Sequence, residues 1–131
     1  MVQKGKYCGI DIVPEMEKRN RLKWSEYEFE TVDIINEEFN RKFDIVCLCG
    51  VFNLKTDNGK EYMEKMLLAA YEKCKECLTF NFISTYVNYV DDGMEYHNPV
   101  DVMRFCIENL SRKVTIIHHY EKCDVACRIF R

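Results

Sequence analysis

The sequence predicts an α/β fold in which a mostly parallel sheet is covered by helices and ends in an antiparallel hairpin. Three observations support this prediction. Short apolar runs alternate with helical patterns along the chain, which is typical of parallel strands joined by helices. The last two apolar runs are separated by only a short turn, which favours an antiparallel pair. The 131 residues contain 47% hydrophobic and 31% charged side chains, which suits one folded domain over residues 1–131.

The N-terminal third is expected to contain a strand, a helix and a second strand. Residues 7–13 form a short apolar run, and Pro14 follows it. Proline is well placed at the first position of a helix, because the N–H that it lacks would have no partner there. Residues 15–23 continue as a polar helical pattern, and residues 27–34 show a weaker strand pattern.

The middle of the chain carries the strongest strand and the clearest amphipathic helix. Residues 43–49 are almost continuously apolar, as expected for a strand covered on both faces. Cys47 and Cys49 lie two residues apart, which puts them on one face of the strand and predicts that both are in the core. After a turn at residues 57–59, apolar residues recur at helical spacing: Met63, Met66, Leu67, Ala70, Tyr71 and Cys74.

The C-terminal third predicts a strand, a loop, a helix and the hairpin. Residues 78–84 form the strand, and a loop containing several tyrosines runs over residues 85–97. Asn98 and Pro99 are a typical N-cap and first helical residue. The hairpin comprises residues 113–120 and 123–130. The expected order is therefore β-α-β-β-α-β-α-β-β.

Charge and hydropathy exclude several classes of protein. The net charge of −3 and the pI near 5.7 provide no large cationic field for binding nucleic acid. No apolar run approaches the roughly 20 residues that span a membrane. Residues 1–6 lack the apolar core of a signal peptide, so we expect a cytoplasmic protein without nucleic-acid or membrane partners.

Eight cysteines are present, and we expect them to be free thiols in a reducing compartment. The CxxC at Cys74 and Cys77 falls at the expected end of a helix, where the helix dipole does not lower a thiol pKa, so redox function is not indicated. Cys123 and Cys127 lack the paired spacing of a zinc site. His118 and His119 alternate on a strand, which predicts one inward and one solvated ring. No metal site is expected.

Candidate ligand-binding residues follow three of the predicted strands. Asp11 and Asp33 end the first two, and the segment 49–53 leaves the third. In open α/β sheets ligands bind at the carboxyl ends of strands, where a carboxylate can accept hydrogen bonds from ribose hydroxyls. Gly50 would let the backbone approach a ligand closely. The set favours a nucleoside ligand, although acids that cap helices and a glycine in a simple turn would give the same pattern.

The same segments resemble the middle motifs of a known family. YCGIDI, DI, FDIV and GVFN occur in an order and spacing similar to class I S-adenosylmethionine (SAM)-dependent methyltransferases, at residues 7–12, 33–34, 43–46 and 50–53. The resemblance covers nearly the whole chain from residue 7. It implies a Rossmann-like three-layer sandwich that lacks the family's first strand and helix, because no glycine-rich GxGxG turn is present.

The resemblance also implies two sets of binding residues and SAM as the cofactor. Asp11 would hold the ribose and Asp33 would border the adenine. The cofactor-binding set would be Asp11, Ile12, Asp33, Ile34, Cys49, Gly50 and Val51. The acceptor set, placed by topology alone, would be Asn53, Tyr86, Tyr89 and Tyr96. No catalytic residue is identified, although His97 is available as a base for a harder acceptor.

The sequence thus predicts SAM-dependent methyl transfer to an unidentified small-molecule acceptor. The alternative is a non-catalytic methyltransferase-like module or fragment that oligomerises through exposed sheet edges, to which another chain could add a strand. An NAD-binding protein is a third interpretation, but it also requires a glycine fingerprint that the sequence lacks.

Overall fold

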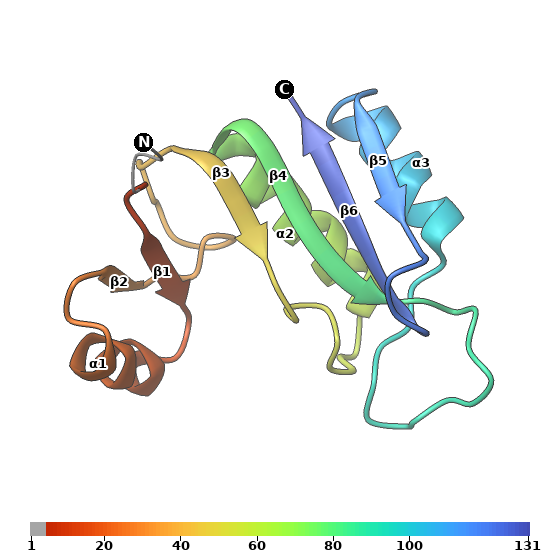
Figure 1. The fold of residues 1–131 in the computed structure, drawn as a ribbon, viewed down its shortest axis with the longest axis horizontal. Coiled ribbons are helices and arrows are strands. Elements are labelled where there is room, and N and C mark those ends of the chain that lie inside the picture. Colours follow the sequence, from red (N-terminus) through yellow and green to blue (C-terminus); the bar gives the residue numbers. More distant parts are fainter. Residues whose placement is uncertain (1–4) are drawn as a thin grey trace. The chain divides into compact units, whose positions relative to one another are not determined.

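The computed structural model describes residues 5–131, which form two compact units (Figure 1). Unit 1 ends at Phe39, and unit 2 comprises Asn40–Arg131. The prediction about a signal peptide concerns residues 1–6, of which 1–4 lie outside the described residues. From residue 5 onward, no helix is both long and apolar enough to cross a membrane. The observed order of strands and helices confirms the predicted β-α-β-β-α-β-α-β-β.

Unit 1 is a two-stranded parallel sheet with one helix in its connection. The strands are β1 (Cys8–Asp11) and β2 (Glu28–Thr31), and α1 (Pro14–Lys23) lies between them in sequence. Pro14 occupies the first turn of α1, as predicted. None of the α1 side chains is buried. The position of α1 in unit 1 is therefore not set by an apolar stripe on the helix.

Unit 2 is a four-stranded mixed sheet with the strand order β3-β4-β6-β5. Its strands are β3 (Phe43–Leu48), β4 (Cys74–Ile83), β5 (Val114–Ile117) and β6 (Asp124–Phe130). β3 pairs with β4 in parallel, whereas β6 is antiparallel to both β4 and β5. Three strands therefore run in one direction, and the last two form the predicted antiparallel pair.

The core of unit 2 lies between this sheet and two helices, α2 (Gly59–Glu72) and α3 (Pro99–Asn109). Figure 1 shows both helices behind the sheet. α2 buries residues at helical spacing, and Asn98 caps α3 by accepting a 2.9 Å hydrogen bond from the Val100 amide. From Leu78 onward in β4, and along β6, every second side chain is almost completely buried: Leu78, Phe80, Phe82, Val125, Cys127 and Ile129.

The prediction that β3 is covered on both faces is wrong, and so is the core position of Cys47 and Cys49. Val46 and Leu48 lie opposite buried residues of β4, on the face that carries the core. Ile45 points to the other face and is 63% exposed, and both cysteines are exposed. An apolar run predicts a buried strand only when both faces find a covering layer, and the unit 2 helices cover one face.

Two further sequence expectations are corrected. Cys74 and Cys77 belong to the start of β4 rather than to the end of a helix, because α2 ends at Glu72. Burial raises the pKa of the Cys74 thiol, which agrees with an inert rather than a redox role. His118 and His119 follow β5 rather than lying on it, and both are largely exposed, although Nε2 of His118 lies 2.9 Å from the hydroxyl oxygen of the buried Ser84. All eight cysteines are free thiols.

Candidate functional site

The clearest local feature at the carboxyl end of β3 is the turn at Gly50. Gly50 has φ +71°, a conformation that side chains with a Cβ rarely adopt. Its amide donates a 2.8 Å hydrogen bond to Oδ1 of Asn81 on β4. The chain therefore turns sharply at the end of β3, and the turn is tied to the neighbouring strand.

A hydrogen-bonded chain of side chains supports this turn. Nδ2 of Asn81 donates to both carboxylate oxygens of Asp124, at 3.2 and 3.1 Å, and the Tyr120 hydroxyl donates to the same carboxylate. Burial and the Asp124 carboxylate raise the pKa of Tyr120 above its ordinary value, so the phenol stays protonated. Sequence analysis missed Asn81, whose only signal is an amide within the apolar run of β4.

The residues after Gly50 turn inward. Val51 is half-buried, and Phe52 is only 2% exposed. The Phe52 ring packs edge-on against Phe80 and His97, with centroid distances of 6.0 and 6.4 Å. Asn53 follows, and its Oδ1 is buried without a hydrogen-bond partner among residues 5–131. The segment predicted to line a cofactor is therefore continuous with residues that pack on the 85–97 loop.

The three predicted acceptor-site tyrosines divide into two groups. Tyr86 and Tyr89 are 63% and 79% exposed. Tyr96 is half-buried, and its hydroxyl accepts a 2.9 Å hydrogen bond from the Asp91 amide, which braces the loop. Tyr96 therefore has a structural role in the loop as well as a place beside the cavity described next.

A cavity of about 270 Å³ lies between α2, α3 and the loop that follows β4. Its apolar wall comes from one face of each helix, and the loop supplies polar groups. The lining residues are Lys60, Met63, Glu64, Leu67, Thr85, Glu95, Tyr96, His97, Asn98, Asp101, Val102 and Phe105. Of the predicted acceptor-site residues, only Tyr96 lines it. Sequence analysis missed the acidic residues, because they are far apart in the sequence and unremarkable singly.

His97 is the buried titratable group of this cavity. It is 6% exposed, and its amide donates to the Ile83 carbonyl at 2.8 Å. Burial lowers the pKa of the ring, although the nearby Glu95 carboxylate and a hydrogen bond with the Phe52 backbone raise it in part. Nε2 is buried and lacks a hydrogen-bond partner within the described part of the chain. The neutral ring therefore offers a nitrogen whose hydrogen-bonding capacity is unused.

In unit 1, Asp11 ends β1 and is half-buried. Its Oδ1 accepts a 2.9 Å hydrogen bond from the Val13 amide, just before α1. This contact makes Asp11 part of the turn into the helix. Such a capping role is the alternative to ligand binding that the sequence analysis allowed for this acid. Ile12 beside it is 64% exposed. The Asp11 side chain retains a second carboxylate oxygen for another hydrogen bond.

Asp33 is more fully engaged in local structure. Its Oδ1 accepts from the amides of Ile35 and Asn36, at 3.0 and 3.3 Å, and its Oδ2 accepts from the Asn36 side chain at 2.7 Å. The Asn36 side-chain bond and the two amides hold the pKa of Asp33 below its usual value. Ile34 is half-buried. Asp33 therefore acts as an ionised cap of the turn that follows it.

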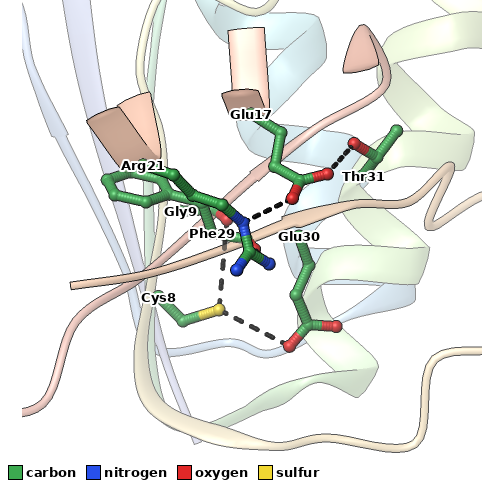
Figure 2. Close-up of polar contacts among 7 residues, drawn as sticks. All are labelled: Cys8, Gly9, Glu17, Arg21, Phe29, Glu30 and Thr31. Carbon is green, nitrogen blue, oxygen red and sulfur yellow. Dashed lines mark hydrogen bonds and ion pairs between the residues drawn. The ribbon is translucent and has the colours of Figure 1, made fainter. Parts of the chain in front are cut away.

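A network of polar contacts fastens α1 to β2 in unit 1 (Figure 2). The Glu17 carboxylate accepts hydrogen bonds from Arg21 on its own helix and from Thr31 at the end of β2. Arg21 also donates to the Phe29 carbonyl. The Thr31 bond is the main reason that the pKa of Glu17 is lowered. These contacts set the start of α1, and hence Asp11, relative to β2.

Unit 1 also brings together three groups that could hold a metal ion. Ligand atoms of Cys8, Glu28 and Glu30 lie within 4.8 Å of one another, because the parallel register sets Cys8 opposite Glu28. The Cys8 thiol donates to Glu30 at 4.0 Å (Figure 2). Metal binding would require loss of that proton. Sequence analysis missed the cluster, since only strand pairing brings it together.

Comparison with protein-family models gives no match, and no curated sequence matches the chain. Solved structures do match. Magnesium protoporphyrin IX methyltransferase from Synechocystis PCC 6803 with bound SAM is similar over 97% of this chain and 60% of its own, with 16% identity and TM-score 0.72. A SAM-dependent methyltransferase from Clostridium acetobutylicum ATCC 824 has TM-score 0.69 and 16% identity, over 96% of this chain and 75% of its own.

A third similar structure is the N-methyltransferase NodS from Bradyrhizobium japonicum WM9 in complex with S-adenosyl-L-homocysteine (SAH). It matches 96% of this chain and 66% of its own, with TM-score 0.62 and 14% identity. The chain has the fold of class I SAM-dependent methyltransferases. The methyltransferase fold predicted from the motifs is thus confirmed. The chain spans about 60% of the length of the Synechocystis enzyme.

Proposed function

We propose that this chain uses SAM as cofactor and transfers its methyl group to a small-molecule acceptor. The Gly50 turn is the observation that carries the proposal. It lies at the carboxyl end of β3, where ligands of open α/β sheets bind, and its positive φ gives the backbone a sharp turn free of a side chain. Structures of the same fold contain bound SAM or SAH.

The proposal assigns Cys49, Gly50 and Val51 to the cofactor in unit 2. In unit 1 it assigns the ribose hydroxyls to Asp11, through the carboxylate oxygen that the turn into α1 does not use. Asp33 is assigned to the adenine together with Ile34. Because the Asp33 carboxylate already accepts three local hydrogen bonds, we expect a smaller contribution from it than from Asp11. Ile12, exposed beside Asp11, would add apolar contact.

Titration calorimetry with SAH tests the cofactor assignment. The Asp11→Asn variant keeps an oxygen for the Val13 amide but removes the negative charge and one acceptor. We expect it to bind SAH at least tenfold more weakly than the wild type. Asp44→Asn is the control, because Asp44 is an exposed residue near the start of β3, at the opposite end of that strand from Gly50. Equal binding by the Asp11 variant would remove Asp11 from the site. Absence of saturable SAH binding to the folded wild-type chain would contradict the cofactor assignment.

A second candidate function, an interaction module, is favoured by the exposed apolar surface of β3. β3 is an edge strand of the four-stranded sheet, and Ile45 and Cys47 are exposed on its uncovered face. Edge strands with apolar side chains readily accept another strand. Light scattering after size exclusion would then detect association in the wild type and its loss in Ile45→Lys. Leu22→Lys, at an exposed position of unit 1, is the control. A wild type that is monomeric at all concentrations would count against this function.

A further inference from the structure

The cavity beside His97 combines an apolar interior with an acidic rim. Met63 and Leu67 from α2, and Val102 from α3, are buried apolar side chains of its wall. The volume of about 270 Å³ corresponds to roughly nine water molecules at about 30 Å³ each. It is therefore large enough for a small organic molecule, and its wall favours one with an apolar body.

The charges around the cavity favour a cation. Glu64, Glu95 and Asp101 line it, against one lysine, Lys60, whose Nζ is 3.9 Å from Glu64. Asp101 also pairs with Arg104 at 3.0 Å, so the surrounding groups retain an excess of one negative charge. The exposed Lys60 and Arg104 side chains can move with little cost. A cationic ligand would therefore meet a net attractive potential.

Glu95 is held at the start of α2. Its Oε2 accepts from the Thr56 amide at 3.4 Å, and its carboxylate lies so close to Gly59 that a Cβ there would come within 2.3 Å of it. The Glu95 charge is thus fixed in place, half-buried, rather than carried on a mobile surface side chain.

His97 provides an independent indication of a ligand. His97 is among the lining residues, and its ring is packed edge-on by Phe52 and Phe82, with centroid distances of 6.4 and 6.0 Å. The buried Nε2 has no hydrogen-bond partner among the residues that the structure describes. Buried polar atoms are rarely left unpaired, and a neutral imidazole whose other nitrogen is hydrogen-bonded needs a donor at this atom. A cation with N–H groups supplies such a donor.

We propose that this cavity binds a primary or secondary amine with an apolar body, with its ammonium group between Glu95 and Nε2 of His97, and that this amine is the methyl acceptor. The acceptor role rests on the proposed SAM-dependent function. Phe52, on which His97 packs, directly follows the Cys49–Val51 segment assigned to the cofactor. The loop that carries His97 therefore packs against the loop that carries the proposed cofactor-lining residues of unit 2.

The chemistry requires a base, because an ammonium nitrogen has no lone pair to attack with. His97 Nε2 accepts one proton from the ammonium group. The amine nitrogen then attacks the sulfonium methyl carbon of SAM; a nitrogen–carbon bond forms and the carbon–sulfur bond breaks. The electron pair of the broken bond stays on sulfur, giving neutral SAH and a methylated ammonium product. His97 returns its proton to water, so one proton is released in each turnover.

Nuclear magnetic resonance titration of the full chain tests the site with 2-phenylethylamine and its neutral analogue 2-phenylethanol. We expect saturable shifts in residues 60–67 and 95–105, a shift of the His97 Nε2 resonance, and binding of the amine at least tenfold tighter than that of the alcohol. Glu95→Gln should reduce amine affinity about tenfold and leave alcohol affinity unchanged. Asp101→Asn should have a smaller effect in the same direction. Glu108→Gln, an exposed residue of α3 outside the lining, is the control.

The outcomes separate the two proposals. Equal affinity for amine and alcohol, or shifts outside the cavity, would overturn the amine site. The amine titration does not depend on SAH. Amine binding by a chain that does not bind SAH would therefore support the amine site and overturn its role as the acceptor site. SAH binding without amine binding would overturn the amine site and leave the cofactor assignment standing. With both bound, a methylated product from an amine of this class is expected.

Discussion

Each of the two compact units of this chain is stabilised internally by a different kind of contact. Unit 1 buries two large apolar side chains, Phe29 and Phe39, and its helix α1 buries none. It relies on the Glu17 network and on the Asp11 and Asp33 turns. Unit 2 contains all the other buried apolar side chains that the structure describes. Burial contributes about 25 cal/mol per Å² of apolar surface, whereas exposed ion pairs contribute little. Unit 2 should therefore be intrinsically far more stable.

The contrast also bears on function. Among its described residues unit 1 buries few large apolar side chains, and a unit with so small a core is only marginally stable by itself. Two proposed cofactor contacts, Asp11 and Asp33, belong to this weakly cored unit. The cavity and the Gly50 turn belong to the well-packed one. We expect cofactor affinity to be more sensitive than amine affinity to conditions that loosen unit 1.

The largest expected effect is on the core of unit 2. Phe82 is 0% exposed and stacks on Phe80 with a centroid distance of 6.0 Å. Phe82→Ala should lower the free energy of unfolding by about 3–5 kcal/mol, because it removes buried contacts and leaves a cavity. Urea denaturation followed by circular dichroism measures the loss. Phe130→Ala, at a 41% exposed position of β6, should cost much less. Similar losses in the two variants would contradict an apolar core as the basis of unit 2.

An intermediate effect is expected at Gly9 in β1. A Cβ at this position would lie 2.6 Å from the ring of Phe29, closer than any relaxed contact. Gly9→Ala should therefore displace that ring and destabilise unit 1 by about 1–3 kcal/mol. Hydrogen exchange of the β2 amides would report the change locally. Gly5→Ala is the matched control, since a Cβ at Gly5 meets nothing within 4 Å. Unchanged protection in both variants would show that Phe29 is not a tightly packed core residue.

The smallest expected effect concerns pH and Glu17. The Thr31 hydrogen bond, with help from Arg21, lowers the pKa of Glu17 below its ordinary value of 4.5. A carboxyl with a depressed pKa in the folded state stabilises that state above the ordinary pKa, and the stabilisation disappears as pH falls through the folded-state pKa. Protection of the unit 1 amides should therefore fall below about pH 4.5.

The variant Glu17→Gln isolates this effect, because its amide does not titrate. Its unit 1 amides should be less protected at pH 6 than those of the wild type and should show less change on acidification. Glu15→Gln, in the first turn of the same helix, is the control and should behave as the wild type does. A wild-type profile in Glu17→Gln would mean that the network in Figure 2 does not contribute to the stability of unit 1.

Local chemistry in the sequence was enough to predict several elements. Pro14 and the Asn98–Pro99 pair mark helix starts whatever surrounds them, because they act through the backbone of the same turn. The order of all nine elements follows from such short-range signals. The burial of β3 does not follow from such signals. An apolar strand shows only that its side chains can be buried, not which layer covers them.

The sequence by itself therefore determined the element order, the methyltransferase fold and the position of Gly50 at the end of its strand. Tertiary structure alone decided which side chains meet. The Asn81 to Asp124 contact, the Cys8 cluster and the acidic cavity at His97 each join residues of separate elements. The physical reason is range: turn and helix preferences act over about four residues, whereas a binding site depends on strand pairing and helix packing, whose partners lie tens of residues apart.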